Sequence, residues 1–292
     1  MILRRLFATL LLAALACGEA AAFNRIVRDV ALPIRHNEAA AYIAAAQAAV
    51  GAPMPARDQR AVNDFFSRAK ADGTLPILSF VYVGYAYAEG AALLDWLHPT
   101  NSSYTLVKTN SPVFTAYTGY SDDASNRGYE NAINFDALPG FAQDAAHLSG
   151  YWMSGTAHVS QSLGGGGSIA NNVYIIPKRT TANTMRARTN DVELDDSTVG
   201  TVTAVAGDRV TVRNGASARQ FYVDGAAAGT SSAASTSVKP NPLRILHNVG
   251  DSGVSASQTI GIVTAGGALT VDHAAALYSN KIKTLRALGA GI

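Results

Sequence analysis

The sequence predicts an all-β fold, a two-sheet antiparallel sandwich or a barrel, with helices at both ends of the chain. From Pro99 onward, short alternating segments rich in β-branched and aromatic residues end in turn residues at intervals of about 8–12 positions. No helical segment between them is long enough for the crossover that parallel strands need. The 292 residues, 26 of them Gly, can form a sizeable core with many tight turns. This pattern is typical of antiparallel sandwiches and barrels.

The predicted strands follow one another along most of the chain. The first, Ile77 to Tyr85, is apolar throughout and is expected to be buried. A short Ala-rich helix is predicted over residues 86–97. The later strands are expected at 103–108, 113–117, 129–135, 147–154, 172–177, 201–205, 208–213, 218–223, 243–247 and 259–263.

The first residues, 1–22, predict a signal-like apolar segment. Arg4 and Arg5 precede an apolar run of about ten residues, and Ala20 to Ala22 offer small residues for cleavage before Phe23. The run is shorter than the roughly 20 residues that span a bilayer, so no stable membrane span is expected. The alternatives are a buried N-terminal helix and lipid attachment at Cys17. Because Cys17 is the only cysteine, no intrachain disulfide or thiolate metal site is expected.

Helices are predicted on both sides of the sandwich. Residues 23–74 form a helical extension, in which Asn37 caps an Ala-rich helix and a second helix places Val62, Phe65 and Phe66 on one face. These helices are expected to pack on the domain that follows, residues 75–292. The chain closes with a helix that Thr270 caps and whose apolar positions recur at helical spacing.

The segment RQFYVDGAAAG, residues 219–229, predicts a β-hairpin. Asp224 and Gly225 tolerate the two positive φ angles of a type I′ turn. The segment is interpreted mainly as a structural hairpin, with binding groups in loops elsewhere.

Two segments carry a family resemblance: Tyr222-Val223-Asp224-Gly225 and the closing stretch from Leu269-Thr270 to Ala276-Leu277-Tyr278. In this order they resemble the laminin-G-like/concanavalin A-like jelly-roll superfamily. Other segments are similar to phage and prophage structural proteins of the tail or virion-associated type. They are Tyr82-Val83, Ala91 to Trp96, Thr109 to Ala116, Gly119-Tyr120, Gln143 to Leu148 and Gly215 to Ala218. The resemblance covers roughly residues 24–290. It implies an antiparallel two-sheet jelly roll, a fold that hosts lectins, glycanases and structural modules alike. The family's Gly-Asp-Gly turn is here Ser121-Asp122-Asp123.

A catalytic site is not expected. Alternation would place Asp191, Glu193 and Asp195 on one strand face, as in jelly-roll glucanases, but the third carboxylate of that pattern is absent at its spacing. A solvated edge or loop is the favoured interpretation of this segment. The six histidines show no metal-ligand spacing, and no Gly-x-Ser-x-Gly motif is present.

Candidate ligand-binding residues lie mostly in predicted loops. Sugars are bound by aromatic faces beside polar side chains, and the candidates are Tyr120, Asp122, Asp123, Asn126, Trp152, Asn248 and Asp251, with Tyr117 and Tyr129 as further aromatics. For each aromatic the alternative is core packing. Asp122, Asp123 and Asn126 also offer oxygen ligands for calcium, although such loops form turns without an ion. No other cofactor is expected.

The charge balance limits the partners. With 23 basic and 21 acidic residues and no basic run, nucleic-acid binding is not expected. The predicted function is lectin-like, non-enzymatic recognition of a cell-surface glycan or polysaccharide in a phage- or prophage-derived virion or surface component. The protein would be secreted or at the cell surface if the signal is cleaved, and otherwise in a virion. The alternatives are a self-assembling virion or filament subunit, contacting itself or other virion proteins, and a secreted glycoside hydrolase.

Overall fold

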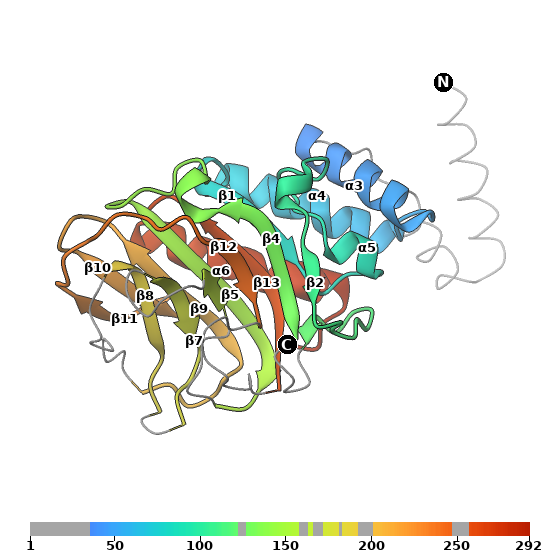
Figure 1. Ribbon diagram of the computed structural model, residues 1–292. Helices are drawn as coiled ribbons and strands as arrows, with labels where there is room; N and C mark the ends of the chain where they lie inside the picture. The colour runs from blue at the N-terminus through green and yellow to red at the C-terminus, as the bar shows by residue number, and fades with distance from the viewer. Residues whose placement is uncertain are drawn as a thin grey trace, which may run out of the picture.

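The computed structural model describes residues 36–121, 127–157, 163–165, 172–180, 183–191, 201–246 and 257–292. Residues 1–22, with the predicted signal and Cys17, lie outside these ranges. The described chain forms two antiparallel sheets packed face to face, with helices against one of them (Figure 1). The predicted antiparallel β-sandwich with a closing helix is confirmed.

The first sheet has the strand order β1-β13-β5-β9-β10-β11, and β3 pairs with the start of β13. Its strands are β1 (Leu78–Val83), β3 (Tyr120–Ser121), β5 (Ala146–Gly155), β9 (Gly207–Arg213), β10 (Arg219–Val223), β11 (Ala226–Ser231) and β13 (Gln258–Gly266). The central strand pairs join segments far apart in sequence, as when Val263 of β13 lies opposite Tyr82 of β1 and Gly150 of β5.

The second sheet has the order β2-β4-β12-β6-β7-β8. Its strands are β2 (Val107–Thr109), β4 (Gly128–Asn134), β6 (Leu163–Gly165), β7 (Asn172–Ile176), β8 (Arg186–Asp191) and β12 (Pro242–Ile245). Three short 3₁₀ turns, at Leu75–Ile77, Ser102–Tyr104 and Phe135–Ala137, connect strands and helices.

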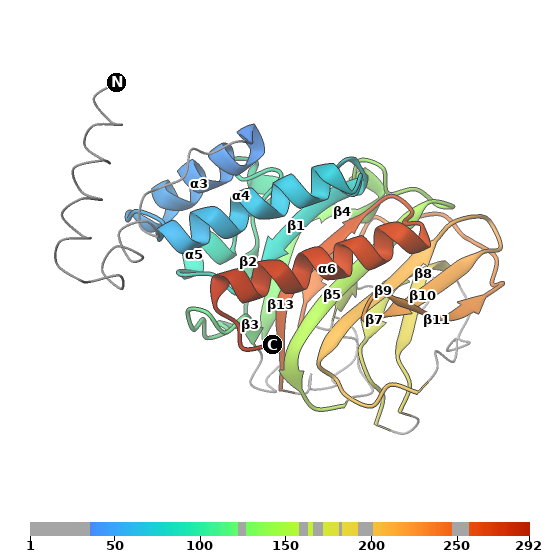
Figure 2. The ribbon, with the colours of Figure 1, turned by 180° about the vertical axis from the view of Figure 1, so that it is seen from behind.

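Four helices complete the described fold: α3 (Asn37–Val50), α4 (Ala56–Ala71), α5 (Glu89–Ala92) and α6 (Val271–Leu288). Figure 2 shows α6 lying across the outer face of the first sheet with α4 beside it. The two helices run antiparallel, because Arg68 of α4 contacts Asn280 of α6 while Gly289, after α6, lies close to Arg57 at the start of α4.

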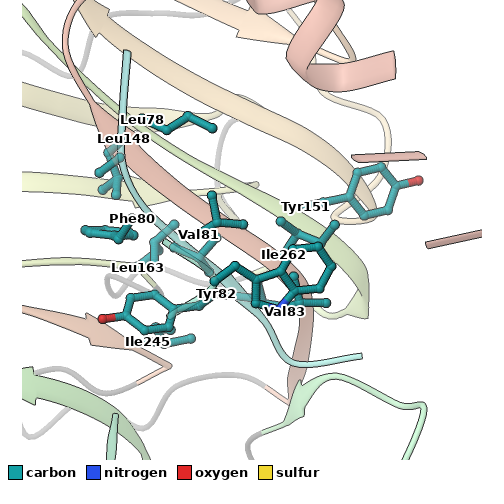
Figure 3. Close-up of a cluster of buried hydrophobic side chains, with 14 of the residues drawn as sticks. Leu78, Phe80, Val81, Tyr82, Val83, Leu148, Tyr151, Leu163, Ile245 and Ile262 are labelled. Carbon is teal, nitrogen blue, oxygen red and sulfur yellow. The ribbon is translucent and has the colours of Figure 1, made fainter. Parts of the chain in front are cut away.

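The core lies between the sheets and continues under the helices. Every residue of β1 is buried, as expected for a strand covered on both faces. Figure 3 shows Phe80 and Tyr82 of β1 beside Leu163 and Ile245 of the second sheet. On the helical side, Trp96 packs against Tyr42 of α3 and Phe65 of α4, with ring centroids 5.1 and 5.3 Å apart. The N-terminal helices therefore pack on the sandwich, as expected.

Five local predictions need correction. Of the strand predicted over 103–108, the first residues belong to the 3₁₀ turn Ser102–Tyr104, and the strand is β2, Val107–Thr109. The predicted strand 113–117 is a loop, in which Tyr117 has a φ of 55°, a value that a strand cannot contain. Residues 201–205 form only an isolated bridge at Thr201. Of the helix predicted over 86–97, only Glu89–Ala92 is helical. Asn37 is the first residue of α3 and does not cap it, since His36 occupies the N-cap.

The hairpin prediction and the C-terminal cap are confirmed, and the two segments touch each other. Asp224 and Gly225 have φ angles of 51° and 76°, and Val223 pairs with Ala226 around a two-residue turn. The Thr270 hydroxyl accepts a hydrogen bond from the backbone N–H of His273 at the start of α6. A Cβ on Gly225 would lie 2.8 Å from the Tyr278 ring, so the hairpin turn and the closing helix pack directly together.

Candidate ligand-binding site

Two of the predicted ligand-binding aromatics, Tyr120 and Trp152, are core residues with no exposed surface. The Tyr120 hydroxyl donates to the carbonyl of Ala92, and its ring packs on Tyr129 with centroids 4.8 Å apart. The Trp152 indole N–H donates to Gln258 Oε1 over 3.0 Å. Both polar groups are therefore satisfied inside the protein, and burial of the large rings stabilises the sandwich. For these rings, and for Tyr129, the alternative of core packing is correct.

The other predicted ligand residues, Asp122, Asp123, Asn126, Asn248 and Asp251, lie outside the described residues. The binding and calcium hypotheses for them stay predictions. The described strand ends that flank these residues meet at one end of the sandwich. Ser121 pairs with Thr259, and Ile245 pairs with both Tyr129 and Leu163.

Of the three carboxylates considered for catalysis, Asp191 alone lies among the described residues. Asp191 is fully buried and accepts hydrogen bonds from Arg213 Nη2, at 3.2 Å, and from Arg219 Nη1. Its charge balances interior guanidinium groups and is not presented to solvent. Glu193 and Asp195 lie outside the described residues. Within those residues, no group of three or more His, Cys, Asp or Glu side chains is placed to hold a metal ion.

None of the helices in the described ranges is both long enough and apolar enough to cross a membrane.

One surface of the described structure combines an accessible aromatic ring with charged groups, and we call it the Tyr117 surface: Arg57, Asp58, Tyr85, Tyr87 and Tyr117. The Tyr117 hydroxyl donates to Asp58 Oδ2 over 3.0 Å, and Arg57 Nε donates to Asp58 Oδ1 over 3.2 Å. The Arg57 guanidinium lies 4.5 Å from the centre of the Tyr117 ring, a cation–π distance. Tyr85 packs beside that ring, with centroids 5.9 Å apart.

Backbone contacts hold Tyr117 in place. Its N–H donates to the carbonyl of Ala86 over 2.9 Å, so the loop is tied to the segment that follows β1. Gly119, at a φ of 113°, lies so close to Ile260 that a Cβ would come within 2.7 Å of the Ile260 carbonyl oxygen. Only glycine fits this approach. Tyr117 itself adopts a left-handed φ that is uncommon for an aromatic residue, and such conformations concentrate at functional positions.

The electrostatics of the Tyr117 surface follow from partial burial. Arg57 leaves 47% of its side chain exposed, whereas Asp58 exposes 3%. Burial raises the pKa of Asp58, and the bonds from Tyr117 and Arg57 oppose that rise. Burial and the nearby Asp58 carboxylate raise the pKa of both Tyr117 and Tyr87. At neutral pH the surface therefore offers a protonated phenol, a guanidinium and an aromatic face.

The sequence pattern indicated Tyr117 as a candidate aromatic but gave no sign of its partners Arg57 and Asp58. Arg57 and Asp58 lie in the first turn of α4, where an acidic residue is expected for helix stability alone. They precede Tyr117 by about sixty positions, a separation that no local pattern can bridge.

Comparisons with known proteins were made in sequence and in structure. No protein-family model matches the chain, and no curated protein matches its sequence. A mutant Trypanosoma rangeli sialidase with trans-sialidase activity superposes with a TM-score of 0.52 at 11% identity, over 76% of this chain and 39% of that one. Botulinum neurotoxin type C, whose cell entry depends on two ganglioside molecules, superposes with a TM-score of 0.50 at 9% identity, over 70% of this chain and 52% of that one.

A third structure has a lower TM-score of 0.44. It is domain 4 of an extracellular arabinanase from Geobacillus stearothermophilus in complex with arabinotriose, at 12% identity over 68% of this chain and 97% of that one. The chain spans about two fifths of the sialidase and half of the toxin chain. At such identities, the two higher-scoring superpositions show that this chain shares the fold of the superposed part of each protein, an antiparallel β-sandwich.

Proposed function

We propose that this chain is a lectin-like recognition module that binds a cell-surface glycan without catalysing its cleavage. The observation that carries the proposal is the Tyr117 surface, where an aromatic ring and a half-exposed guanidinium adjoin each other and are both held by the buried Asp58 carboxylate. Sugar-binding sites combine such aromatic surface with a few oriented polar groups. The fold is shared with a sialidase and with a toxin whose cell entry depends on gangliosides, which supports the same class of ligand.

The wider setting of the module is part of the same proposal. The motif order resembles that of phage and prophage structural proteins, which supports a virion or surface component. The apolar segment at residues 1–22 supports export to the cell surface if it is cleaved. Mass spectrometry of the mature N-terminus tests this directly. A start at Phe23 would establish export, and a retained Met1 would favour assembly inside the cell.

The binding proposal is tested on a glycan array and by pull-down on envelope polysaccharide, with the full chain and its variants. We expect Tyr117→Ala to lower the affinity for the selected glycan about tenfold, because the loss of one aromatic contact costs about 1–1.5 kcal/mol. Tyr117→Phe keeps the ring and should retain more of the binding. Val113→Ala is the control, because Val113 is 67% exposed in the same loop and lies outside the surface.

Two results would overturn the binding proposal. The first is no glycan bound above background by the unmodified chain. The second is equal affinity of Tyr117→Ala and Val113→Ala for a glycan that does bind. The calcium hypothesis for Asp122, Asp123 and Asn126 is tested separately, by the change in melting temperature on adding calcium.

A self-assembling subunit is the second candidate function, and the edge of the first sheet favours it. Among the described strands, β11 pairs on one side only, with β10. Charged residues and proline normally protect a free edge, and its sequence, AAAGTS, contains neither. Sedimentation of the purified chain discriminates the candidates, since a stable high-order assembly supports self-assembly and a monomer opposes it. The hydrolase alternative is tested by the release of reducing sugar, and the burial of Asp191 supports a negative result.

A further inference from the structure

A groove lies between α4 and α6, on the helical side of the molecule, and charged and polar side chains are among its lining residues. Its volume is about 320 Å³, near the small end of the range for ligand sites. Arg68 and Asp72 line it from α4 and the turn that follows, and Ser279, Asn280 and Lys283 line it from α6, with two alanines between them. The groove is large enough for a small polar molecule or one unit of a longer ligand.

The Arg68 guanidinium is fixed in this groove by two neutral partners. Its Nε donates to Asn280 Oδ1 over 2.7 Å, and its Nη2 donates to Thr284 Oγ1 over 2.9 Å. These bonds use Nε–H and one of the two hydrogens of Nη2, so Nη1 and the second hydrogen of Nη2 can still donate to another group. The end that these donors form matches a carboxylate or phosphate in bidentate geometry. The side chain is therefore oriented for an anion before any anion arrives.

The charge of Arg68 is not balanced by an ion pair within the described parts of the chain. Asp72 is the acidic residue of the groove lining, and its Oδ1 already accepts hydrogen bonds from the backbone N–H and the hydroxyl of Thr74. Burial lowers the pKa of Arg68, and the charges of Asp64 and Asp72 offset this lowering only in part. Lys283 adds a second positive charge to the lining.

We propose that this groove binds the oxyanion group of a small ligand, a carboxylate or a phosphate, with Arg68 as the bidentate anchor and Lys283 as a second cation. The groove is separate from the Tyr117 surface. Eleven helical positions separate Arg57 from Arg68 on α4, a distance of about 16 Å at the rise of an α-helix. The oxyanion site therefore stands whether or not the Tyr117 surface binds a glycan.

Calorimetric titration of the full chain with sodium glucuronate, sodium phosphate and glucose tests the site. We expect at least one of the two anions to bind and glucose to give no heat. Binding should weaken with added salt, because the groove is open to solvent. Arg68→Gln should lower the affinity for the bound anion about tenfold, since it removes a charge-assisted bidentate contact. Lys283→Gln should lower it about threefold.

The control is Lys70→Gln, which removes one positive charge from an exposed position of α4 outside the groove. Arg68→Gln also loses the contacts to α6, so its melting temperature is measured alongside. Lys283 is exposed and lies outside these contacts, so its variant tests the site without disturbing the helix pair. Tighter binding of glucuronate than of phosphate would identify a sugar carboxylate as the ligand group, and the reverse would identify a phosphorylated ligand.

Three results would overturn the proposal: no heat with either anion, glucose binding as tightly as the anions, or anion affinity unchanged in both Arg68→Gln and Lys283→Gln. Tyr117→Ala should leave the anion titration unchanged. A failure of this site and a failure of glycan recognition are therefore separate outcomes.

Discussion

Gly225 shows how one position joins two distant segments of the chain. It occupies the second place of the hairpin turn with a φ of 76°, and its missing side chain makes room for the Tyr278 ring of α6. The residue before it, Asp224, accepts a hydrogen bond from the backbone N–H of Asp208 over 2.7 Å. Glycine is required here for both its backbone conformation and its size.

Replacing Gly225 by Ala should therefore lower the free energy of unfolding by more than the backbone strain alone would. We expect Gly225→Ala to lower the free energy of unfolding by about 2–4 kcal/mol, from strain in the left-handed region and from overpacking against Tyr278. Gly51→Ala is the matched control, because Gly51 has a φ of 72° and open space around its Cβ direction. It should cost about 1–2 kcal/mol. If urea unfolding showed the same loss of unfolding free energy for Gly225→Ala and Gly51→Ala, the contact with Tyr278 would contribute nothing to stability.

At the scale of elements, α6 is held on the first sheet by a buried ionic contact. Lys281 Nζ donates to Asp208 Oδ1 and to Ser149 Oγ, each over 2.7 Å, and the three side chains have no exposed surface. The Ser149 and Thr264 hydroxyls are 2.6 Å apart, which extends the network across β5 and β13. Burial lowers the pKa of Lys281 and raises that of Asp208, and their mutual attraction opposes both shifts. The buried position indicates a structural role for the Ser149–Lys281 pair.

Breaking this contact from one side should destabilise the whole fold. We expect Lys281→Met to lower the free energy of unfolding by about 3–5 kcal/mol, because Asp208 would be left buried without its partner. The double variant Lys281→Met with Asp208→Asn should cost less than the sum of the single changes. Lys283→Met, two positions along at an exposed site, is the control and should stay within about 0.5 kcal/mol. If denaturant unfolding showed that the double variant loses as much unfolding free energy as the two single variants together, Lys281 and Asp208 would not be a coupled pair.

At the scale of the whole molecule, burial makes stability depend on pH through His147. This residue is fully buried, and its Nδ1–H donates to the carbonyl of Gly267 over 2.5 Å. Burial lowers its pKa from 6.5 to about 4; the Gly267 bond opposes the shift and the Lys281 charge adds to it. The unfolded chain takes up a proton near pH 6.5 and the folded chain only near pH 4. The stability from this group is therefore complete above about pH 6.5 and is lost as the pH falls toward 4.

The pH profile of unfolding should show this loss. Between pH 7.5 and 5, we expect the free energy of unfolding to fall by about 2 kcal/mol. His147→Gln should be less stable at pH 7.5 and should show a flatter profile over that range. Burial also raises the pKa of Asp58, Asp95 and Asp208, and these groups change stability with the opposite sign, so the difference between the wild-type and His147→Gln profiles isolates the histidine. An unchanged slope in the variant would exclude His147 as the source.

Local features of the sequence determined much of the fold. Alternation located most of the strands, Asp224-Gly225 specified the turn, and Thr270 specified the start of α6, because each depends on the conformational preferences of a few adjacent residues. Where the prediction was wrong, as for the strand at 113–117, contacts with distant residues prevailed over local β-propensity. The Tyr117 N–H bonds to Ala86 and not to a neighbouring strand.

The tertiary structure alone decided which side chains are accessible and which residues meet. Tyr117, Tyr120 and Trp152 look equally suited to a sugar in the sequence, yet packing between the sheets buries two of them and leaves the first at the surface. Arg68 and Asn280 are 212 positions apart and line the same groove only because α4 and α6 pack side by side in antiparallel directions. Local preferences act between neighbours in the chain, whereas burial and site geometry depend on contacts between distant segments.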